Sequence, residues 1–175
     1  MQPIETPRLL LRVDNYEEYI SAFATLDDAA LKTRFGIQTD MDLETQKAKV
    51  SGGLVTYRTS LVYFHLILKE TQEVVGSFAY HNWYPRDQRS EIGYDIKTEA
   101  HKNKGYMKEA FPFMIAYGFE TMELNRMEAF IDPSNTASRR LVEGAGFHEE
   151  ALLKQRYRPA DEFRDGVVYA LLASR

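Results

Sequence analysis

The stretch "EIGYDIKTEAHKNKGYMKEAF", residues 91–111, passes from a strand pattern through a loop rich in amide and ammonium donors to a helix pattern after Gly105. A helix start has backbone N–H groups without partners and a partial positive charge, so it favours an anion. Lys102, Lys104 and Lys108 add full charges there. The stretch therefore predicts a phosphate-bearing ligand, and a solvated charge run at an ordinary helix start is the competing interpretation.

The composition indicates one globular domain spanning residues 1–175. The chain is 44% hydrophobic and has no long Pro, Ser or Gly tract. A formal net charge of -4 argues against nonspecific binding to nucleic acid or to an anionic membrane. Cysteine is absent, which excludes a cysteinyl acyl-enzyme and fits a cytoplasmic protein. The longest apolar run, "LVYFHLIL", is too short to span a bilayer, and no signal peptide is expected.

The spacing of apolar residues predicts a mixed α/β sheet with helices packed against it. We expect strands at 8–13, 61–70, 74–84, 90–96, 126–131, 149–159 and 166–173. We expect helices from Asp14 or Asn15 to Phe23, then at 27–35, 42–57, 105–122 and 136–145. The strand, helix and strand between 91 and 131 imply a parallel pair, and ligands of such sheets bind beyond the carboxyl ends of the strands, where the lysine loop lies.

Several functional classes are disfavoured by the absence of their motifs. The chain has neither G-x-x-x-x-G-K-[ST] nor G-x-G-x-x-G at a helix start, which argues against a nucleotide triphosphatase and a dinucleotide oxidoreductase. The four histidines, including His65, are scattered, so no metal site is expected. We expect His65 to be a buried strand residue.

Three segments resemble the Gcn5-related N-acetyltransferases (GNAT), particularly the RimJ/RimL-type branch that acetylates ribosomal-protein N-termini. They are "EIGYDI", "KGYMKEA" and "LNRMEAFIDPSNTASRRLVEGAGF", and the likeness extends from "IETPRLLLR" to "VVYALL". The resemblance implies the GNAT fold, α/β (α+β), with a mixed central sheet of about seven strands, splayed between the fourth and fifth strands, and helices on both faces. It also implies acetyl-coenzyme A (acetyl-CoA) as donor and a primary amine as acceptor.

The resemblance also assigns residues that bind acetyl-CoA. The family's pyrophosphate motif maps onto Lys102, Gly105 and Met107, with Asn103 where a glycine is common. Because this loop is about one residue longer than usual, we assign the whole run: Lys102, Asn103, Lys104, Gly105, Tyr106, Met107 and Lys108. The family's pantetheine arm adds to a strand as a further strand would, which implies contacts with the backbone of Asp95, Ile96 and Lys97.

The resemblance suggests a serine as the donor that protonates the departing thiolate. Many family members place a tyrosine where this chain has Val142. The serine-using branch places its serine three residues after the motif's asparagine, which corresponds to Ser138 after Asn135. Residues at i and i+3 of a helix share a face, so Asn135 could hold pantetheine while the Ser138 hydroxyl reaches sulfur. The competing interpretation is that both residues cap the helix.

Several groups are candidates for the general base. The related branch has a glutamate where this chain has Tyr157, so that role does not carry over. Glu91 and Asp95 alternate with Gly93 on one face of a strand, and either carboxylate could accept a proton directly or through water. Water or Tyr157 itself stays an alternative.

The acceptor is expected to be a cationic amine. Acidic side chains at Glu91 and Asp95, with aromatic Trp83, Tyr84 and Tyr94 nearby in sequence, would suit such an amine. The resemblance favours a protein N-terminal α-amine, and a polyamine or an aminoglycoside is the alternative. A noncatalytic acyl-CoA-binding module is a third reading. We expect no nucleic-acid or membrane partner, and a monomer or homodimer.

Overall fold

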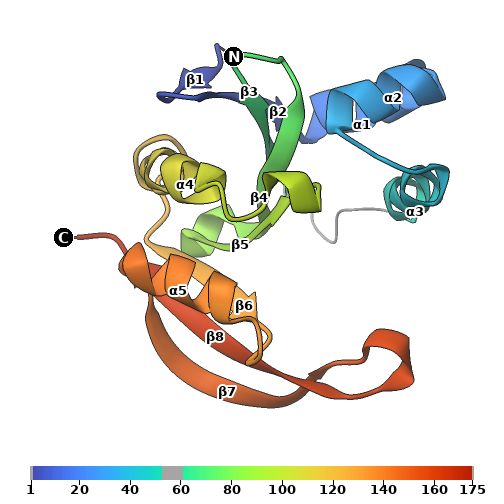
Figure 1. The fold of residues 1–175 in the computed structure, drawn as a ribbon. Coiled ribbons are helices and arrows are strands. Elements are labelled where there is room, and N and C mark those ends of the chain that lie inside the picture. The colour runs from blue at the N-terminus through green and yellow to red at the C-terminus, as the bar shows by residue number, and fades with distance from the viewer. Residues whose placement is uncertain (1, 53–60, 175) are drawn as a thin grey trace. The chain divides into compact units, whose positions relative to one another are not determined.

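A computed structural model describes residues 2–52 and 61–174, whose strands form one eight-stranded mixed sheet in the order β1-β2-β3-β4-β5-β6-β8-β7 (Figure 1). The strands are β1 (Ile4–Glu5), β2 (Leu9–Asn15), β3 (Val62–Leu68), β4 (Val74–Tyr84), β5 (Arg89–Ile96), β6 (Arg126–Ile131), β7 (His148–Tyr157) and β8 (Arg164–Leu172). The α-helices are α1 (Tyr16–Thr25), α2 (Asp28–Phe35), α3 (Asp40–Ser51), α4 (Tyr106–Ala116) and α5 (Thr136–Gly144). β5 and β6 are parallel, as expected.

The chain divides into two compact units that share β5. The first contains the residues up to Trp83 together with Gly93–Met114. The second contains Tyr84–Ile92 and the residues from Ile115 onward. The mixed sheet confirms the expected fold class, with eight strands in place of about seven because the short strand β1 was not predicted. The expected splay between the family's fourth and fifth strands stays a prediction.

In the first unit, helices cover both faces of the sheet. Successive strand residues point to opposite faces. Tyr63 of β3 packs against Tyr19 of α1, with ring centroids 5.2 Å apart. The next residue, Phe64, faces the other side and contacts Phe78 of β4, which packs edge-on against Phe111 of α4 at 5.6 Å. α1 therefore lies on one face of this part of the sheet and α4 on the other.

Local capping signals set most of the helix ends. The Asn15 side chain accepts the N–H of Glu18 and forms a capping box at the start of α1. The Asp27 side chain accepts the N–H of Ala30 and so caps the start of α2, and Gly36 ends this helix in the left-handed conformation. α3 begins at Asp40, two residues before the expected start, because its N-cap is Thr39. Residues 53–57 of the expected helix lie outside the described residues.

A buried ionic group joins β2, β3 and α2. Asp14 is not the start of a helix but a strand residue, 2% exposed, whose Oδ2 lies 2.9 Å from Nε2 of the fully buried His65. Arg34 donates to the other oxygen of Asp14 at 2.7 Å. Burial lowers the pKa of His65 to about 4, so the ring is neutral at pH 7. The expectation of a buried strand histidine is confirmed.

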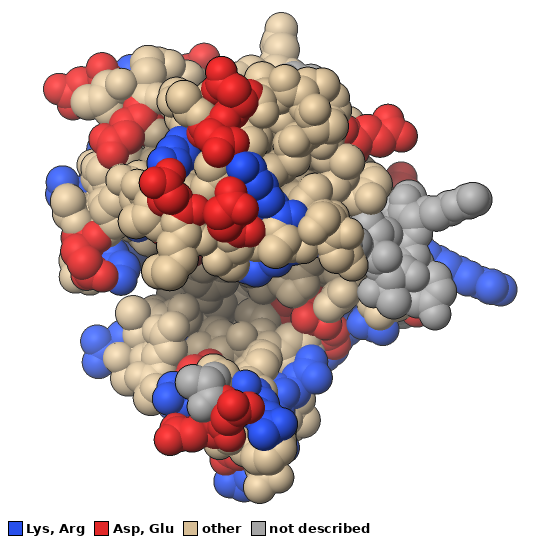
Figure 2. Space-filling model, turned by 90° about the vertical axis from the view of Figure 1, so that its right-hand side faces the viewer, with Lys and Arg blue, Asp and Glu red and all other residues tan. Residues whose placement is uncertain are grey.

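Ion pairs also link the outer surfaces of α2 and α3. Lys47 of α3 lies 2.8 Å from Asp28 of α2, and Lys32 of α2 lies 2.5 Å from Asp40 of α3. Figure 2 shows acidic and basic side chains interspersed on one face of the molecule. Water and salt screen such exposed pairs, so they contribute little to the stability of the fold.

In the second unit, the strand pairs support the helix α5. Arg89–Glu91 of β5 pair with Arg126–Glu128 of β6, and β6 pairs antiparallel with β8. Arg139 of α5 donates to the hydroxyl of the buried Tyr169 of β8 at 2.9 Å. Within the described parts of the chain, no helix has the length and apolar content needed to cross a membrane.

Candidate active site

The loop before α4 presents a row of free backbone donors, as expected. Lys102 N–H donates to Glu99 and Glu109 N–H donates to Gly105. Between them, the N–H groups of 103–108 have no acceptor among the residues that the structure describes. Asn103 and Gly105 have φ angles of 60° and 77°, in the left-handed region. Asparagine tolerates this conformation better than most residues, which explains how Asn103 replaces the glycine common in the family.

The lysines of this loop are not equivalent. Lys102 Nζ lies 2.5 Å from a carboxylate oxygen of Glu99, within the same turn. Lys104 and Lys108 have no ion pair among the described residues, so their charges are free for an anion. The loop therefore combines unpaired N–H groups, two unpaired ammonium groups and the N-terminal end of α4, which together suit a pyrophosphate.

The N-terminal segment fixes this loop in place, which the sequence did not reveal. Arg8 Nε donates to Oε2 of Glu109 at 2.6 Å, and the Thr6 hydroxyl donates to Oε1 at 2.6 Å. Arg8 also donates to the carbonyl of Lys104 at 3.1 Å and lies over the Tyr106 ring at 4.7 Å. Burial would raise the pKa of Glu109, but the hydrogen bonds and the charge of Arg8 hold it below its ordinary value. Arg8 and Glu109 are thus positioning residues for the loop.

Glu109→Gln should weaken acetyl-CoA binding by about 3- to 10-fold, because losing a charge-assisted pair loosens a loop whose N–H groups must converge. Isothermal calorimetry would measure the change in dissociation constant. Lys69→Gln is the matched control, since it removes an exposed 2.8 Å ion pair with Glu5 in the same unit. Unchanged acetyl-CoA affinity in Glu109→Gln, with the control also unchanged, would show that Arg8 does not position the loop.

At the end of β5, the backbone groups differ in whether they face the neighbouring strand β4. Lys97 N–H donates to the carbonyl of Val75 in β4 at 2.9 Å. The Asp95 carbonyl also faces β4, because a Cβ at Gly76 would lie 2.7 Å from it. Strand residues alternate in the edge to which their backbone groups point, so those of Ile96 point away from β4. Of the three residues expected to hold pantetheine, Ile96 is the one with backbone groups free of β4.

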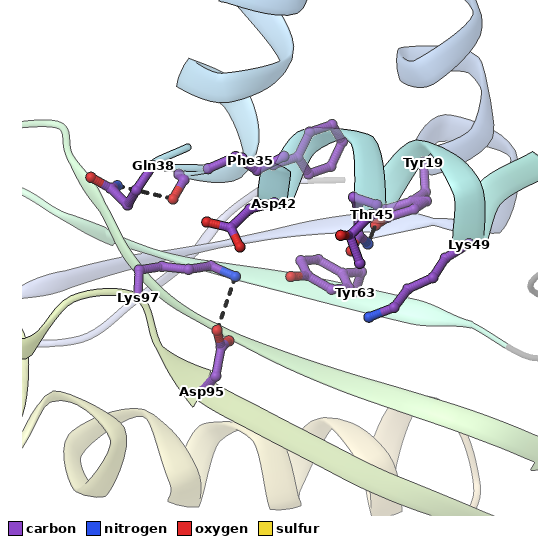
Figure 3. A pocket seen from close by; sticks show the side chains of 12 residues that line it. Tyr19, Phe35, Gln38, Asp42, Thr45, Lys49, Tyr63, Asp95 and Lys97 are labelled. Atoms are coloured by element: carbon purple, nitrogen blue, oxygen red, sulfur yellow. Dashed lines mark hydrogen bonds and ion pairs between the residues drawn. The ribbon is translucent and has the colours of Figure 1, made fainter. Parts of the chain in front are cut away.

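The Asp95 side chain lies at the edge of a pocket of about 260 Å³ in the first unit (Figure 3). Lys97 Nζ lies 3.0 Å from Oδ2 of Asp95, and the Ser77 hydroxyl donates to Oδ1. The carboxylate is 49% exposed, so it can accept a further donor. The pocket is lined by residues of α1, β3, β5, α3 and the end of α2, namely Tyr19, Phe35, Gly36, Ile37, Gln38, Asp42, Thr45, Gln46, Lys49, Tyr63, Asp95 and Lys97.

The aromatic residues of this pocket differ from those expected. Tyr94 lies on the opposite face of β5, where its ring packs edge-on against Phe111 at 5.1 Å. Neighbours along a strand point to opposite faces, so Tyr94 cannot join Asp95. Tyr19, Phe35 and Tyr63 line the pocket instead. Burial raises the pKa of both tyrosines, which therefore present neutral hydroxyl groups.

In the second unit, the expected serine and asparagine have separate roles. Asn135 is the N-cap of α5, and its Oδ1 accepts the N–H of Ser138 at 3.1 Å. Asn135 is therefore the residue that caps α5, and its side-chain NH₂ group can donate to a ligand. The Ser138 hydroxyl has no hydrogen-bond partner among the described residues. Val142, at the family's tyrosine position, is fully buried and offers no proton.

Glu91 and Tyr157 interact in the second unit. Burial raises the pKa of Tyr157 above its ordinary value, and the nearby charge of Glu91 adds to this, although Arg156 opposes it. The phenol therefore keeps its proton at neutral pH, which suits a donor better than a base. Over the described residues, no group of three or more His, Asp or Glu side chains could hold a metal ion.

Comparisons with known proteins agree on a family. The profile of the acetyltransferase (GNAT) domain matches residues 8–148. An uncharacterized N-acetyltransferase of Bacillus licheniformis, p20, is 37% identical over 109 residues, which are 62% of this chain and 61% of that protein. The chain thus matches less than two thirds of that relative's length.

Two solved structures share the fold and differ in acceptor. An acetyltransferase of Salmonella typhimurium, described as modifying the N-terminal serine of a 50S ribosomal subunit protein, has a TM-score of 0.71 at 20% identity, covering 97% of each chain. A spermidine/spermine N-acetyltransferase of Vibrio cholerae has a TM-score of 0.67 at 14% identity, covering 94% of this chain and 92% of that one. Likeness of fold alone therefore does not identify an acceptor.

Proposed function

Because the chain belongs to the GNAT family, and is therefore an N-acetyltransferase with acetyl-CoA as cosubstrate, we propose that its acceptor is the α-amine of a protein N-terminus. The amine enters the pocket beside Asp95 and takes the acetyl group directly from the thioester. A direct transfer fits a chain without cysteine.

The balance of charge in the pocket supports this acceptor over a polyamine or an aminoglycoside. Asp42 and Asp95 contribute two negative charges, and Lys49 and Lys97 contribute two positive charges. A polycation would meet two ammonium groups there, whereas an N-terminus brings one ammonium and several backbone hydrogen-bonding groups. The volume, about 260 Å³, lies just below the usual range for drug-sized ligands, which suits the first one or two residues of a peptide.

The proposal assigns acetyl-CoA binding to two sets of residues. The loop Lys102–Lys108 would hold the pyrophosphate through its free N–H groups and through Lys104 and Lys108. The pantetheine would pair with the backbone at Asp95–Lys97, chiefly at Ile96, and would accept from the side-chain NH₂ of Asn135. Ser138 would stand at the sulfur.

The transfer then moves two protons off the nitrogen. The ammonium first loses one to Asp95, directly or through water, and the resulting amine attacks the thioester carbonyl. The C–N bond forms, the C–S bond breaks, and the nitrogen loses its second proton as the adduct collapses. Ser138 donates a proton to the departing thiolate and is reprotonated, through water, by the second proton of the nitrogen. Asp95 releases the first proton to solvent, so the products are an amide, a thiol and one released proton.

A panel assay tests the acceptor class. Thiol release from acetyl-CoA would be followed with peptides bearing free N-termini, the same peptides with blocked N-termini, spermidine and an aminoglycoside. We expect turnover only with free N-termini, with kcat/KM at least about 10-fold above that of spermidine, because two lysines face the pocket. Turnover with spermidine and none with peptides would contradict the proposal, and a flat panel would favour a binding module.

A further inference from the structure

We infer that the acceptor carries a carboxylate close to its amine, as in a protein whose second residue is Glu or Asp, and that Lys49 binds this carboxylate. The inference rests on the proposed function, since it takes the pocket beside Asp95 as the acceptor site. It adds a sequence preference and a specificity-determining residue.

The outer part of the pocket is a polar stripe on α3. Asp42, Thr45, Gln46 and Lys49 stand at helical spacings of three and four, so they share one face of the helix. Leu43, 1% exposed, lies beside this stripe and packs into the core of the unit. The stripe therefore borders the buried part of α3, and its polar side chains can contact a bound chain.

Lys49 differs from the other lysines of this region. Lys97 is paired with Asp95 at 3.0 Å, and Lys47, two residues before Lys49, is paired with both Asp28 and Glu44. Lys49 has no ion pair among the described residues. Figure 3 shows its side chain extending from α3 toward Tyr63 at the pocket. An unpaired ammonium at a binding pocket suits an anionic group of the ligand.

Two side chains that line the pocket therefore match two charges of one ligand. Asp95, which is half-exposed, suits the ammonium, and Lys49, from a different element, suits a carboxylate. A carboxylate on the second residue of a peptide lies within a few bonds of the N-terminal amine. The α-carboxylate of a free amino acid has the same chemistry, and the experiment must separate the two sources.

The test compares peptides that are identical except at their second residue. Peptides beginning Ser-Glu, Ser-Gln and Ser-Lys would be assayed with the wild-type protein, together with free serine. We expect kcat/KM to be about 3- to 10-fold higher for Ser-Glu than for Ser-Gln, and lowest for Ser-Lys. Lys49→Gln should bring the Ser-Glu to Ser-Gln ratio to about 1, and Lys49→Glu should make Ser-Lys the best peptide.

Lys47→Gln is the matched control, because it removes a lysine from the same helix that does not line the pocket. It should leave the wild-type preference intact. If all three peptides are acetylated equally, or if Lys49→Gln keeps the preference, the inference is wrong and the proposed function stands. If free serine is acetylated and the peptides are not, or if none of these compounds is acetylated, both the proposed function and the inference are wrong.

Discussion

Replacing Ser138 with alanine should lower kcat and kcat/KM together by about 10- to 10³-fold while acetyl-CoA binds nearly as before. A hydroxyl that donates to the departing sulfur acts only in the transition state, so its loss slows turnover without weakening the ground state. The structure also lowers the expected cost in stability. Because Asn135 is the cap, Ser138→Ala keeps the 3.1 Å bond from the Ser138 N–H, and the free energy of unfolding should change by less than about 0.5 kcal/mol.

Two variants separate this role from a structural one. Ser138→Thr keeps a hydroxyl and should recover part of the rate. Ser134→Ala removes a hydroxyl from the same turn, where it donates to Asp132 at 2.6 Å, and should leave the rate nearly unchanged. Steady-state kinetics and thermal unfolding of the three variants would be compared. Wild-type turnover in Ser138→Ala would transfer the donor role to another group, such as the neutral phenol of Tyr157.

The fold was largely predictable because its signals are local. Asn15 and Asp27 cap their helices with side chains that reach three residues ahead, and Gly36 ends a helix by its own conformation. These signals are readable in any short window of sequence. β1 was not predicted because a segment of two residues is too short to show the alternation of apolar and polar residues that is typical of a strand. Ile4–Glu5 are a strand only through their pairing with β2.

The site was predictable where a motif carries it and unpredictable where distant residues meet. The helix start after Gly105 and the cap at Asn135 were expected from sequence. Arg8 and Glu109, which are 101 positions apart, were missed because no local pattern links them. For the same reason the partner of His65 was not foreseen: Asp14 is 51 positions away, and its place before a helix suggested a cap.

The direction in which side chains point was also predicted only in part from the sequence. The alternation along β5 placed Glu91, Gly93 and Asp95 on one face, but adjacency in sequence suggested that Tyr94 would join them. Because successive side chains of a strand point to opposite faces, Tyr94 lies on the face of β5 that packs against α4. The α3 residues of the pocket, Thr45 and Lys49, gave no signal because a polar helix stripe is usually solvated.

Asp95→Asn should lower kcat/KM by about 10²-fold or more and remove the acidic limb of the pH–rate profile, because an amide cannot accept the amine's proton. The variant also loses the 3.0 Å pair with Lys97, so Lys97→Gln, which breaks that pair but keeps the carboxylate, should retain the acidic limb. Glu91→Gln tests the other carboxylate on this face of β5 and should change the profile little, since Glu91 does not line the pocket. If Glu91→Gln instead loses the limb and Asp95→Asn keeps it, Glu91 is the base and Asp95 only orients the amine. Unchanged profiles in both would leave proton removal to water.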